Sequence, residues 1–208
     1  MNRRTSILAL ALAVAAPLAP ARSAPAPAHT PAHTPAQTPA QTPALWRIDP
    51  GASHLGFVTS FGGVRVSGEF PVWDASIRFD PKDLAHSRVV AVIGMRRVRT
   101  GNADQEQALP TPTFFDAPAF PQARFEADHI VALGAGHYAA SGTLTVRGAS
   151  RPLTLPFTLA ISGAQAAMTG EVTISRLAFG IGQNEWKATD TLPDPVQVTV
   201  TIHARRVP

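Results

Sequence analysis

The last third of the chain alternates between apolar and polar residues with a period of two, from Gly142 to Ala204. The pattern is clearest in segments 143–146 and 196–204. Successive side chains of a strand point to opposite faces, so this alternation predicts strands with one apolar and one polar face. A protein built from such strands has an interior, and its function depends on what that interior holds.

Similar short segments recur through the rest of the folded region, separated by Gly, Pro, Asn and Asp turn signals. We expect strands over 45–49, 54–60, 64–70, 72–79, 89–95, 124–133, 137–147, 153–161, 168–175 and 196–204. One short helix is predicted over 101–109, where Pro110 ends it. Segment 111–121, with three prolines and three phenylalanines, is expected to be an irregular cap. Many short strands with one helix indicate an all-β sandwich or barrel.

The first 44 residues are expected to lie outside the fold. Residues 1–21 have the features of a secretory signal peptide: Arg3 and Arg4, a ten-residue apolar run over 7–16, and small residues at 19–21. Residues 22–44 are rich in Pro, Ala and Thr and predict an extended linker. The domain organisation is therefore a signal peptide over 1–21, a disordered linker over 22–44 and a β-barrel domain over 45–208, in a periplasmic or secreted protein.

The charge of the chain argues against a nucleic-acid partner. The net charge is +4 over 208 residues, but from Leu45 onward there are 15 basic and 14 acidic residues. Nucleic-acid binders usually carry a clustered basic excess, which this balance does not provide. The absence of cysteine excludes disulfides and thiol chemistry, so the 164 residues from Leu45 must be stabilised by their core.

No sequence pattern predicts catalysis or a metal site. Asp49, Ser53 and His54 have the composition of a catalytic triad, but adjacent strand residues point to opposite faces. The glycines at 134 and 136 lead into a strand, whereas a dinucleotide site requires a helix. The remaining histidines are scattered. We therefore expect a protein that is not an enzyme and has neither a cofactor nor a metal.

Several segments, in this order, resemble the YceI-like family of exported lipid-binding proteins. The resemblance covers about residues 46–204 and rests on Trp46-x-Ile48-Asp49 with Ser53 and Phe57, Gly68-x-Phe70, Phe114-Phe115-Asp116 with Phe120-Pro121 and Phe125, Gly142-x-Leu144-Thr145-Val146-Arg147-Gly148, and Arg176-x-x-Phe179-Gly180-Ile181. The order and spacing of these segments make the match specific.

The resemblance implies an eight-stranded, antiparallel, lipocalin-like barrel. Its elongated interior would take a long isoprenoid chain, such as a quinone tail or a prenyl lipid. A barrel of eight strands either fills its interior with side chains or holds one small ligand. The family often has a histidine before the serine of its first motif, where this chain has Ala52, and another where it has Phe61. Any contact with a lipid head group would differ accordingly.

The residues expected to bind the ligand are mostly phenylalanines. They are Phe57, Phe70, Phe79, Phe114, Phe115, Phe120, Phe125, Phe179, Arg176 and Trp186. For any single phenylalanine, simple core filling is an equal alternative. Phe114, Phe115 and Phe120 differ, since the prolines around them exclude a regular strand; we expect this segment to fold over one barrel mouth.

Two questions stay open at the level of sequence. Arg176 either meets a phosphate or quinone oxygen, or pairs with Asp190 or Asp194. The protein is either a carrier of a hydrophobic small molecule, linked to envelope stress or quinones, or an accessory module for a membrane redox protein in which any lipid is structural. A transient membrane contact and a homodimer are compatible with both.

Overall fold

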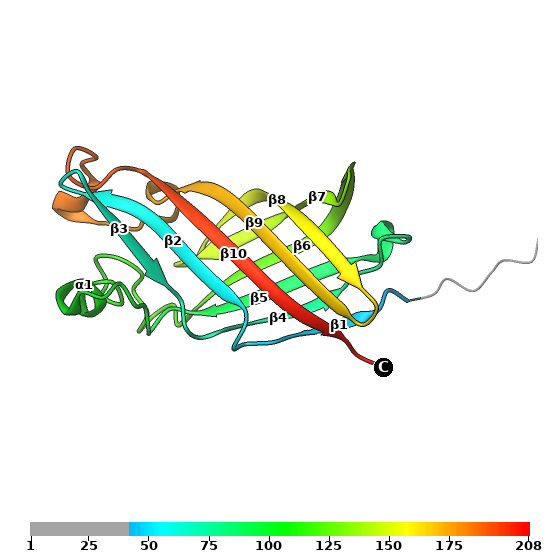
Figure 1. Cartoon of the computed structure of the whole chain (residues 1–208). Helices are drawn as coiled ribbons and strands as arrows, with labels where there is room; N and C mark the ends of the chain where they lie inside the picture. The colour runs from blue at the N-terminus through cyan, green and yellow to red at the C-terminus, as the bar shows by residue number, and fades with distance from the viewer. Residues whose placement is uncertain (1–41) are drawn as a thin grey trace, which may run out of the picture. The chain divides into compact units, whose positions relative to one another are not determined.

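The computed structural model describes residues 42–208 (Figure 1). Its elements are, in order, β1 (Leu45–Ile48), β2 (His54–Phe61), β3 (Val64–Glu69), β4 (Trp73–Arg78), the 3-10 helix η1 (Leu84–His86), β5 (Arg88–Gly94), α1 (Ala103–Ala108), β6 (Gln122–Gly134), β7 (His137–Val146), β8 (Ala149–Ser162), β9 (Gln165–Ser175), η2 (Leu177–Phe179), η3 (Asn184–Lys187) and β10 (Pro195–Arg206). The predicted signal peptide and most of the predicted linker lie outside the described residues.

The strands form one antiparallel sheet that closes on itself. From β4 to β10 each strand pairs with the next along the chain, and β1 pairs with both β4 and β10. The closing contact runs from Trp46↔Arg206 to Ile48↔Ala204. Eight strands therefore complete the ring, which confirms the predicted all-β, eight-stranded antiparallel barrel with one short α-helix.

The hairpin of β2 and β3 extends the barrel at one end. β10 pairs first with β2 and then, nearer its carboxyl end, with β1, so β1 and β2 form one interrupted strand. Ser53 lies in the interruption; its hydroxyl donates to the carbonyl of His203 and accepts from the N–H of His203. The hairpin, α1 and η3 gather at this end of the barrel, and the β8–β9 turn lies at the other (Figure 1).

Two irregular segments cap the end that carries α1. Segment 95–121 contains α1, which Asn102 caps by accepting from the N–H of Gln105, and a series of turns in place of a strand, as predicted. Segment 176–194 contains η2 and η3. Two consecutive N–H groups, of Gly182 and Gln183, donate to the carbonyl of Thr113. The two segments thus form one hydrogen-bonded cap.

The opposite end is closed by packed aromatic residues. Trp46 is 3% exposed and its indole N–H donates to the carbonyl of Phe79 at 3.0 Å. Tyr138 packs edge-on against Phe79 and stacks on Phe157, with ring centroids 5.5 and 5.4 Å apart. The sheet therefore encloses a space between an aromatic end and a capped end.

Candidate functional site

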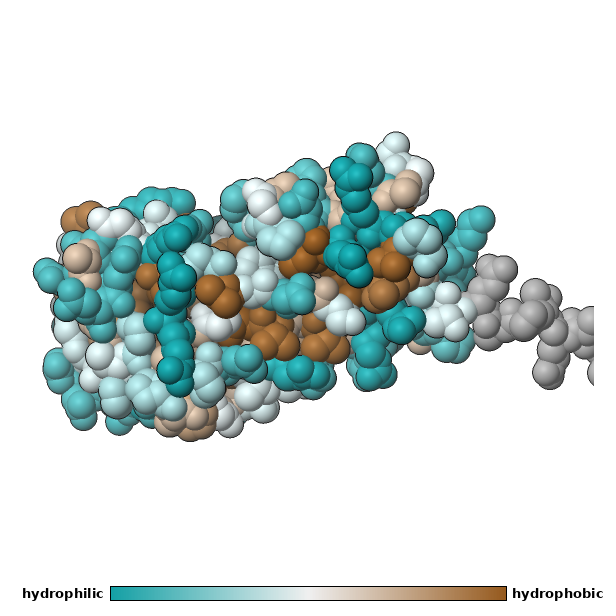
Figure 2. Space-filling view, turned by 90° about the horizontal axis from the view of Figure 1, so that it is seen from below, coloured by the Kyte–Doolittle hydropathy of each residue, from teal (hydrophilic) through white to brown (hydrophobic). Residues whose placement is uncertain are grey.

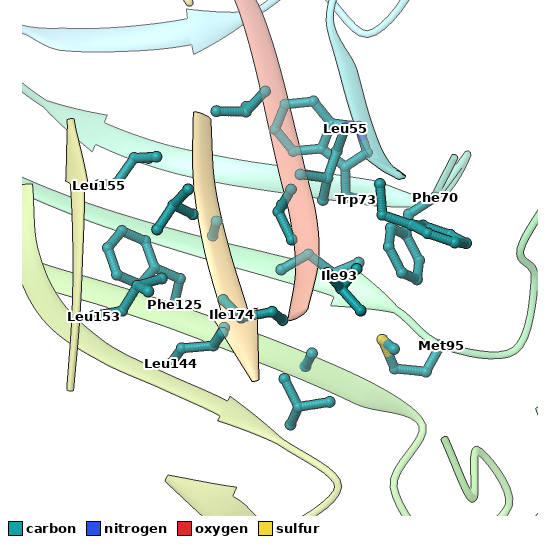
Figure 3. Close-up of a pocket in the computed structure, with 18 of the residues that line it drawn as sticks. Leu55, Phe70, Trp73, Ile93, Met95, Phe125, Leu144, Leu153, Leu155 and Ile174 are labelled. Atoms are coloured by element: carbon teal, nitrogen blue, oxygen red, sulfur yellow. The ribbon is translucent and has the colours of Figure 1, made fainter. Parts of the chain in front are cut away.

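A cavity of about 610 Å³ lies inside the barrel. Inward side chains from all ten strands line it, together with residues of the cap. Figure 3 shows part of this lining, with Leu55, Trp73, Ile93, Phe125 and Ile174 directed into the space from different strands. Pockets for small molecules usually measure about 300–1,000 Å³. The barrel interior is therefore hollow and large enough for a ligand.

The two ends of the cavity differ in chemistry. At the aromatic end the lining is apolar and includes Trp46, Phe79 and Ala204. The polar lining residues lie on β2, in α1 and its preceding turn, or in the cap; they are Thr59, Thr100, Asn102, Asp104, Gln105 and Arg176. Because Asn102, Asp104 and Phe61 are exposed, the cavity reaches the protein surface at this end. An amphiphile with a polar head and a long apolar tail matches this distribution.

Eight of the ten residues expected at the site line the cavity. Phe57, Phe70 and Phe115 form a chain of rings near the cap, with centroids 5.5 and 5.9 Å apart. Phe114 and Trp186 pack against each other at 5.7 Å and also line the space. The others are deeper or in the cap: Phe79, Phe125 and Arg176. The expectation that the proline-rich segment folds over one mouth agrees with this placement.

Phe120 and Phe179 lie away from the cavity, in contrast to the expectation. The ring of Phe120 lies against Gly148, where a Cβ would come within 2.8 Å of its Cε1. Phe179 is 4% exposed and belongs to the packed core at the capped end. Both are in irregular segments, where no strand alternation indicates which way a side chain points.

Arg176 acts as a hydrogen-bond centre for the cap. It is 2% exposed, and its guanidinium donates to four backbone carbonyls, those of Pro193, Ile181, Ala188 and Leu192, at 2.6–3.1 Å. Burial lowers the pKa of Arg176, and the nearby charge of Asp194 opposes that shift. Neither Asp190 nor Asp194 forms an ion pair with it in the described residues, so the ion-pair alternative for Arg176 does not hold there.

Arg147 donates two hydrogen bonds to the cap. Its Nη1 donates to the carbonyl of Phe114 at 3.1 Å and to that of Gly180. It thereby ties both cap segments to the end of β7. Sequence reasoning quoted Arg147 only as part of a motif, and its role depends on carbonyls 33 residues away in each direction.

The components of a triad are not assembled. The Ser53 hydroxyl is engaged with the backbone of His203, the Asp49 carboxylate accepts from the N–H of Gly51, and His54 is exposed on β2. Within residues 42–208, His, Asp and Glu side chains form no cluster of three or more that could hold a metal. In the same part of the chain, no helix is long and apolar enough to cross a membrane.

Comparison with known proteins assigns the family. Residues 46–204 match the model of the YceI-like domain. The chain belongs to the YceI-like family.

Two curated relatives match this YceI-like chain over about half of its length. A UPF0312 protein of Yersinia pestis is 34% identical over 102 residues, and one of Vibrio campbellii is 29% identical over 103. Each match covers about half of this chain, and the chain spans about half the length of these curated relatives.

Solved structures share the YceI-like barrel. BcnA of Burkholderia cenocepacia superposes with a TM-score of 0.73 at 29% identity, covering 75% of this chain and 98% of that one. A polyisoprenoid-binding domain from Saccharophagus degradans gives 0.60 at 16% identity, covering 79% and 99%. The second likeness is one of fold.

The structure explains why several residues of the YceI-like motifs are needed. Gly68 lies directly beneath the ring of Phe57, where a Cβ would clash. Gly142 faces the backbone of Glu126 and Ala127 beside an irregularity in the β6–β7 ladder, and a Cβ there would clash with the Glu126 carbonyl. Arg176, Phe179 and Gly180 build the cap.

Sequence reasoning missed the aliphatic majority of the lining. On β8 alone, alternate residues Leu153, Leu155, Phe157, Leu159 and Ile161 line the cavity. Their period of two was the signal that could have identified them, once the barrel interior was taken as the site.

Hydrophobic side chains also reach the surface, where Figure 2 shows a band of them between hydrophilic ones on one face.

Proposed function

We propose that this protein binds a long-chain isoprenoid or related amphiphilic lipid inside its barrel and does not catalyse a reaction. The observation that carries the proposal is the apolar cavity of about 610 Å³. Burial of each methylene group contributes about 0.8 kcal/mol, so a long chain binds such a surface without specific polar contacts. The polyisoprenoid-binding domain from Saccharophagus degradans has the same fold, which supports this ligand class.

The cellular part of the proposal is carriage or sequestration of the lipid outside the cytoplasm. It rests on the signal-peptide features of residues 1–21 and the proline-rich segment after them. A periplasmic or secreted protein of this kind would take up a lipid such as a quinone or prenyl lipid during respiration or envelope stress. It would contact a membrane only transiently.

The hollow interior favours the carrier over the interaction module. If the barrel served only to contact a membrane redox protein, its interior would be expected to be filled by its own side chains, as in many small barrels. Inward apolar side chains from ten strands line the cavity and do not fill it. A ligand that fills this space explains the arrangement directly.

The proposal is tested by filling the cavity. Ala91 on β5 lines the cavity, and its neighbour Val90 points to the outer face. Ala91→Phe should abolish or strongly weaken binding of farnesol, measured by the fluorescence of Trp46, Trp73 and Trp186, which all line the cavity. Val90→Phe is the matched control and should bind like the unmodified protein. Equal binding by both variants, or none by the unmodified protein, would refute the proposal.

A further inference from the structure

Thr59 is a polar residue in an apolar part of the cavity wall. It follows Leu55 and Phe57 on the inward face of β2 and precedes Phe61, and all four line the cavity. Its partner on β3 is Val66, and continuation of the β2–β10 register places Val196 on the other side. The Thr59 hydroxyl is buried and has no hydrogen-bond partner among the described residues.

An unpartnered hydroxyl in such a place is unfavourable. Burial of a hydroxyl without a hydrogen-bond partner destabilises the folded state, because the bond to water is lost and not replaced. Valine has nearly the same shape and is equally suited to a strand, and it occupies both flanking positions, Val66 and Val196. Strand formation and packing therefore do not require threonine at residue 59. The cavity leaves this oxygen no accessible surface, so a ligand would supply the missing partner after rotation about the Cα–Cβ bond exchanges the hydroxyl with the methyl group.

The charges around the cavity select the kind of head group. Arg176 is the single cation among the lining residues, and its Nε and Nη2 groups already donate to backbone carbonyls. Asp104, the other charged lining residue, would repel an anion. Four of the five N–H donors of Arg176 are engaged, so a phosphate would find one remaining N–H of Nη1 for its charge, whereas a hydroxyl or carbonyl oxygen needs only one hydrogen bond.

We infer that the Thr59 hydroxyl binds the neutral oxygen of an isoprenoid alcohol or quinone at the capped end of the barrel, with the apolar tail directed toward Trp46. This inference rests on the proposed function. The threonine would donate to a carbonyl or exchange a hydrogen bond with a hydroxyl, since it can act as donor and acceptor. It would determine head-group selectivity, whereas the aliphatic wall supplies most of the affinity.

The test compares two probes that differ in one oxygen, farnesol and the hydrocarbon farnesene. Thr59→Val should weaken farnesol binding about two- to thirteenfold, the effect of one hydrogen bond of about 0.5–1.5 kcal/mol, and leave farnesene binding unchanged. Thr59→Ser keeps the hydroxyl and should retain the preference for farnesol. Thr59→Val should also be at least as stable as the unmodified protein to urea.

Each result separates the inference from the proposed function. If Thr59→Val binds both probes like the unmodified protein, or weakens both equally, the inference is overturned while lipid binding stands. If neither probe binds to the unmodified protein, the proposed function itself fails. Tighter binding of farnesyl pyrophosphate than of farnesol would contradict the neutral head group.

A second, independent observation concerns the wall between β8 and β9. Their ladder runs from Ser162↔Gln165 to Phe157↔Gly170 and then ends. Beyond that point residues 149–156 still pair with β7, and residues 171–175 still pair with β10. The two strands are thus each held on one side only. We call this unpaired stretch the split seam.

Two prolines explain where the ladder stops. The N–H of Leu159 donates to Gly136 on the β7 side, and alternate residues of an antiparallel strand bond to the same neighbour. The backbone N–H and C=O groups of residues 152, 154 and 156 therefore point toward β9. Two of these three are Pro152 and Pro156, which have no N–H to donate. The sequence of β8 therefore lacks two of the three donors that would extend the ladder.

We propose that the split seam is a lateral portal through which the isoprenoid chain enters and leaves. Directly behind it, Leu153 and Leu155 of β8 and Val172 and Ile174 of β9 line the cavity. Along this stretch no β8–β9 hydrogen-bond ladder blocks lateral passage. A flexible chain can pass between them while the paired strands on either side remain intact.

Restoring the missing donors tests the portal. Pro152→Val with Pro156→Val should extend the ladder, so that the two new amides exchange hydrogen slowly. The double variant should also release farnesol severalfold more slowly, with affinity little changed. Thr154→Val, on the same strand and also on the outer face, adds no donor and serves as control. Protected amides with an unchanged dissociation rate would overturn the portal. Freely exchanging amides would overturn the role of the prolines.

Discussion

The Nη1 group of Arg176 donates to the carbonyl of Ile181 at 2.9 Å, inside a segment that has almost no regular structure of its own. Three further carbonyls of the same segment accept from this guanidinium. A loop normally runs over the surface because its buried carbonyls would lack partners. Here one buried arginine satisfies four of them and fixes the cap over the cavity.

Replacement of this arginine should destabilise the protein. Arg176→Met removes the donors and leaves four carbonyls without partners, so we expect a loss of about 3–5 kcal/mol in the free energy of unfolding. Urea denaturation measures it. Arg176→Lys should recover only a minor part of the lost stability, because an ammonium group cannot reproduce the planar set of N–H donors of a guanidinium. A loss below about 1 kcal/mol for Arg176→Met would show that the cap does not depend on this residue.

The phenylalanines of the proline-rich segment should differ in their effect on binding. Phe114→Ala and Phe115→Ala remove rings that line the cavity and should weaken farnesol binding, since each buried aromatic ring contributes about 1.5–3 kcal/mol. Phe120→Ala is the matched control, because Phe120 lies against Gly148 outside the lining. Unchanged affinity in the first two variants, with stability also unchanged, would remove this segment from the site.

The start of α1 should respond to acid. The Glu106 carboxylate accepts from the N–H groups of Thr100 and Gly101 at 2.9 and 3.0 Å, and these bonds lower its pKa below the ordinary 4.5. Because the folded pKa lies below the unfolded one, the stabilisation is complete at neutral pH and is lost as the pH falls through the folded pKa. The protection of the amides of residues 100 and 101, measured by NMR hydrogen exchange relative to the intrinsic rate at each pH, should fall over that range. Glu106→Gln should show no such acid step; an identical profile in both proteins would refute the assignment.

Gly142 should tolerate no side chain. A Cβ at this position would overlap the carbonyl of Glu126, which belongs to a neighbouring strand and cannot rotate away. Gly142→Ala should therefore cost more than about 2 kcal/mol of stability through strain in the β6–β7 ladder. Ser141→Ala, one residue earlier, is the control and should stay within about 1 kcal/mol of the unmodified protein in thermal or urea unfolding. Equal stability of the two variants would contradict the close approach.

The sequence predicted the strands well because their signal is local. Alternation with period two on β7, β8, β9 and β10 needs no knowledge of neighbours. The structure shortens the predicted β7 by one residue and lengthens the other three strands by three to five residues. The pairing of Trp46 with Arg206, which closes the ring, joins opposite ends of the domain. The eight-stranded closure could therefore be expected only through the family resemblance.

The irregular segments were less predictable for a physical reason. The direction of Phe114 toward the cavity and of Phe179 into the core is set by hydrogen bonds between segments far apart in sequence, such as those of Arg147. The two open alternatives for Arg176 both assumed a charged or ligand partner, whereas its partners are backbone carbonyls. The prolines of β8 were visible in the sequence, but their meaning depends on which neighbour they face.

The central claim is that the barrel holds a lipid, and mass spectrometry of an organic extract tests it most directly. The full-length protein should be purified from the cells that naturally produce it, and the Ala91→Phe variant should be extracted in parallel. We predict close to one isoprenoid-type lipid with a neutral head group per protein, and a strongly reduced amount in the variant. An extract without any such lipid, or with equal amounts from both proteins, would contradict the account.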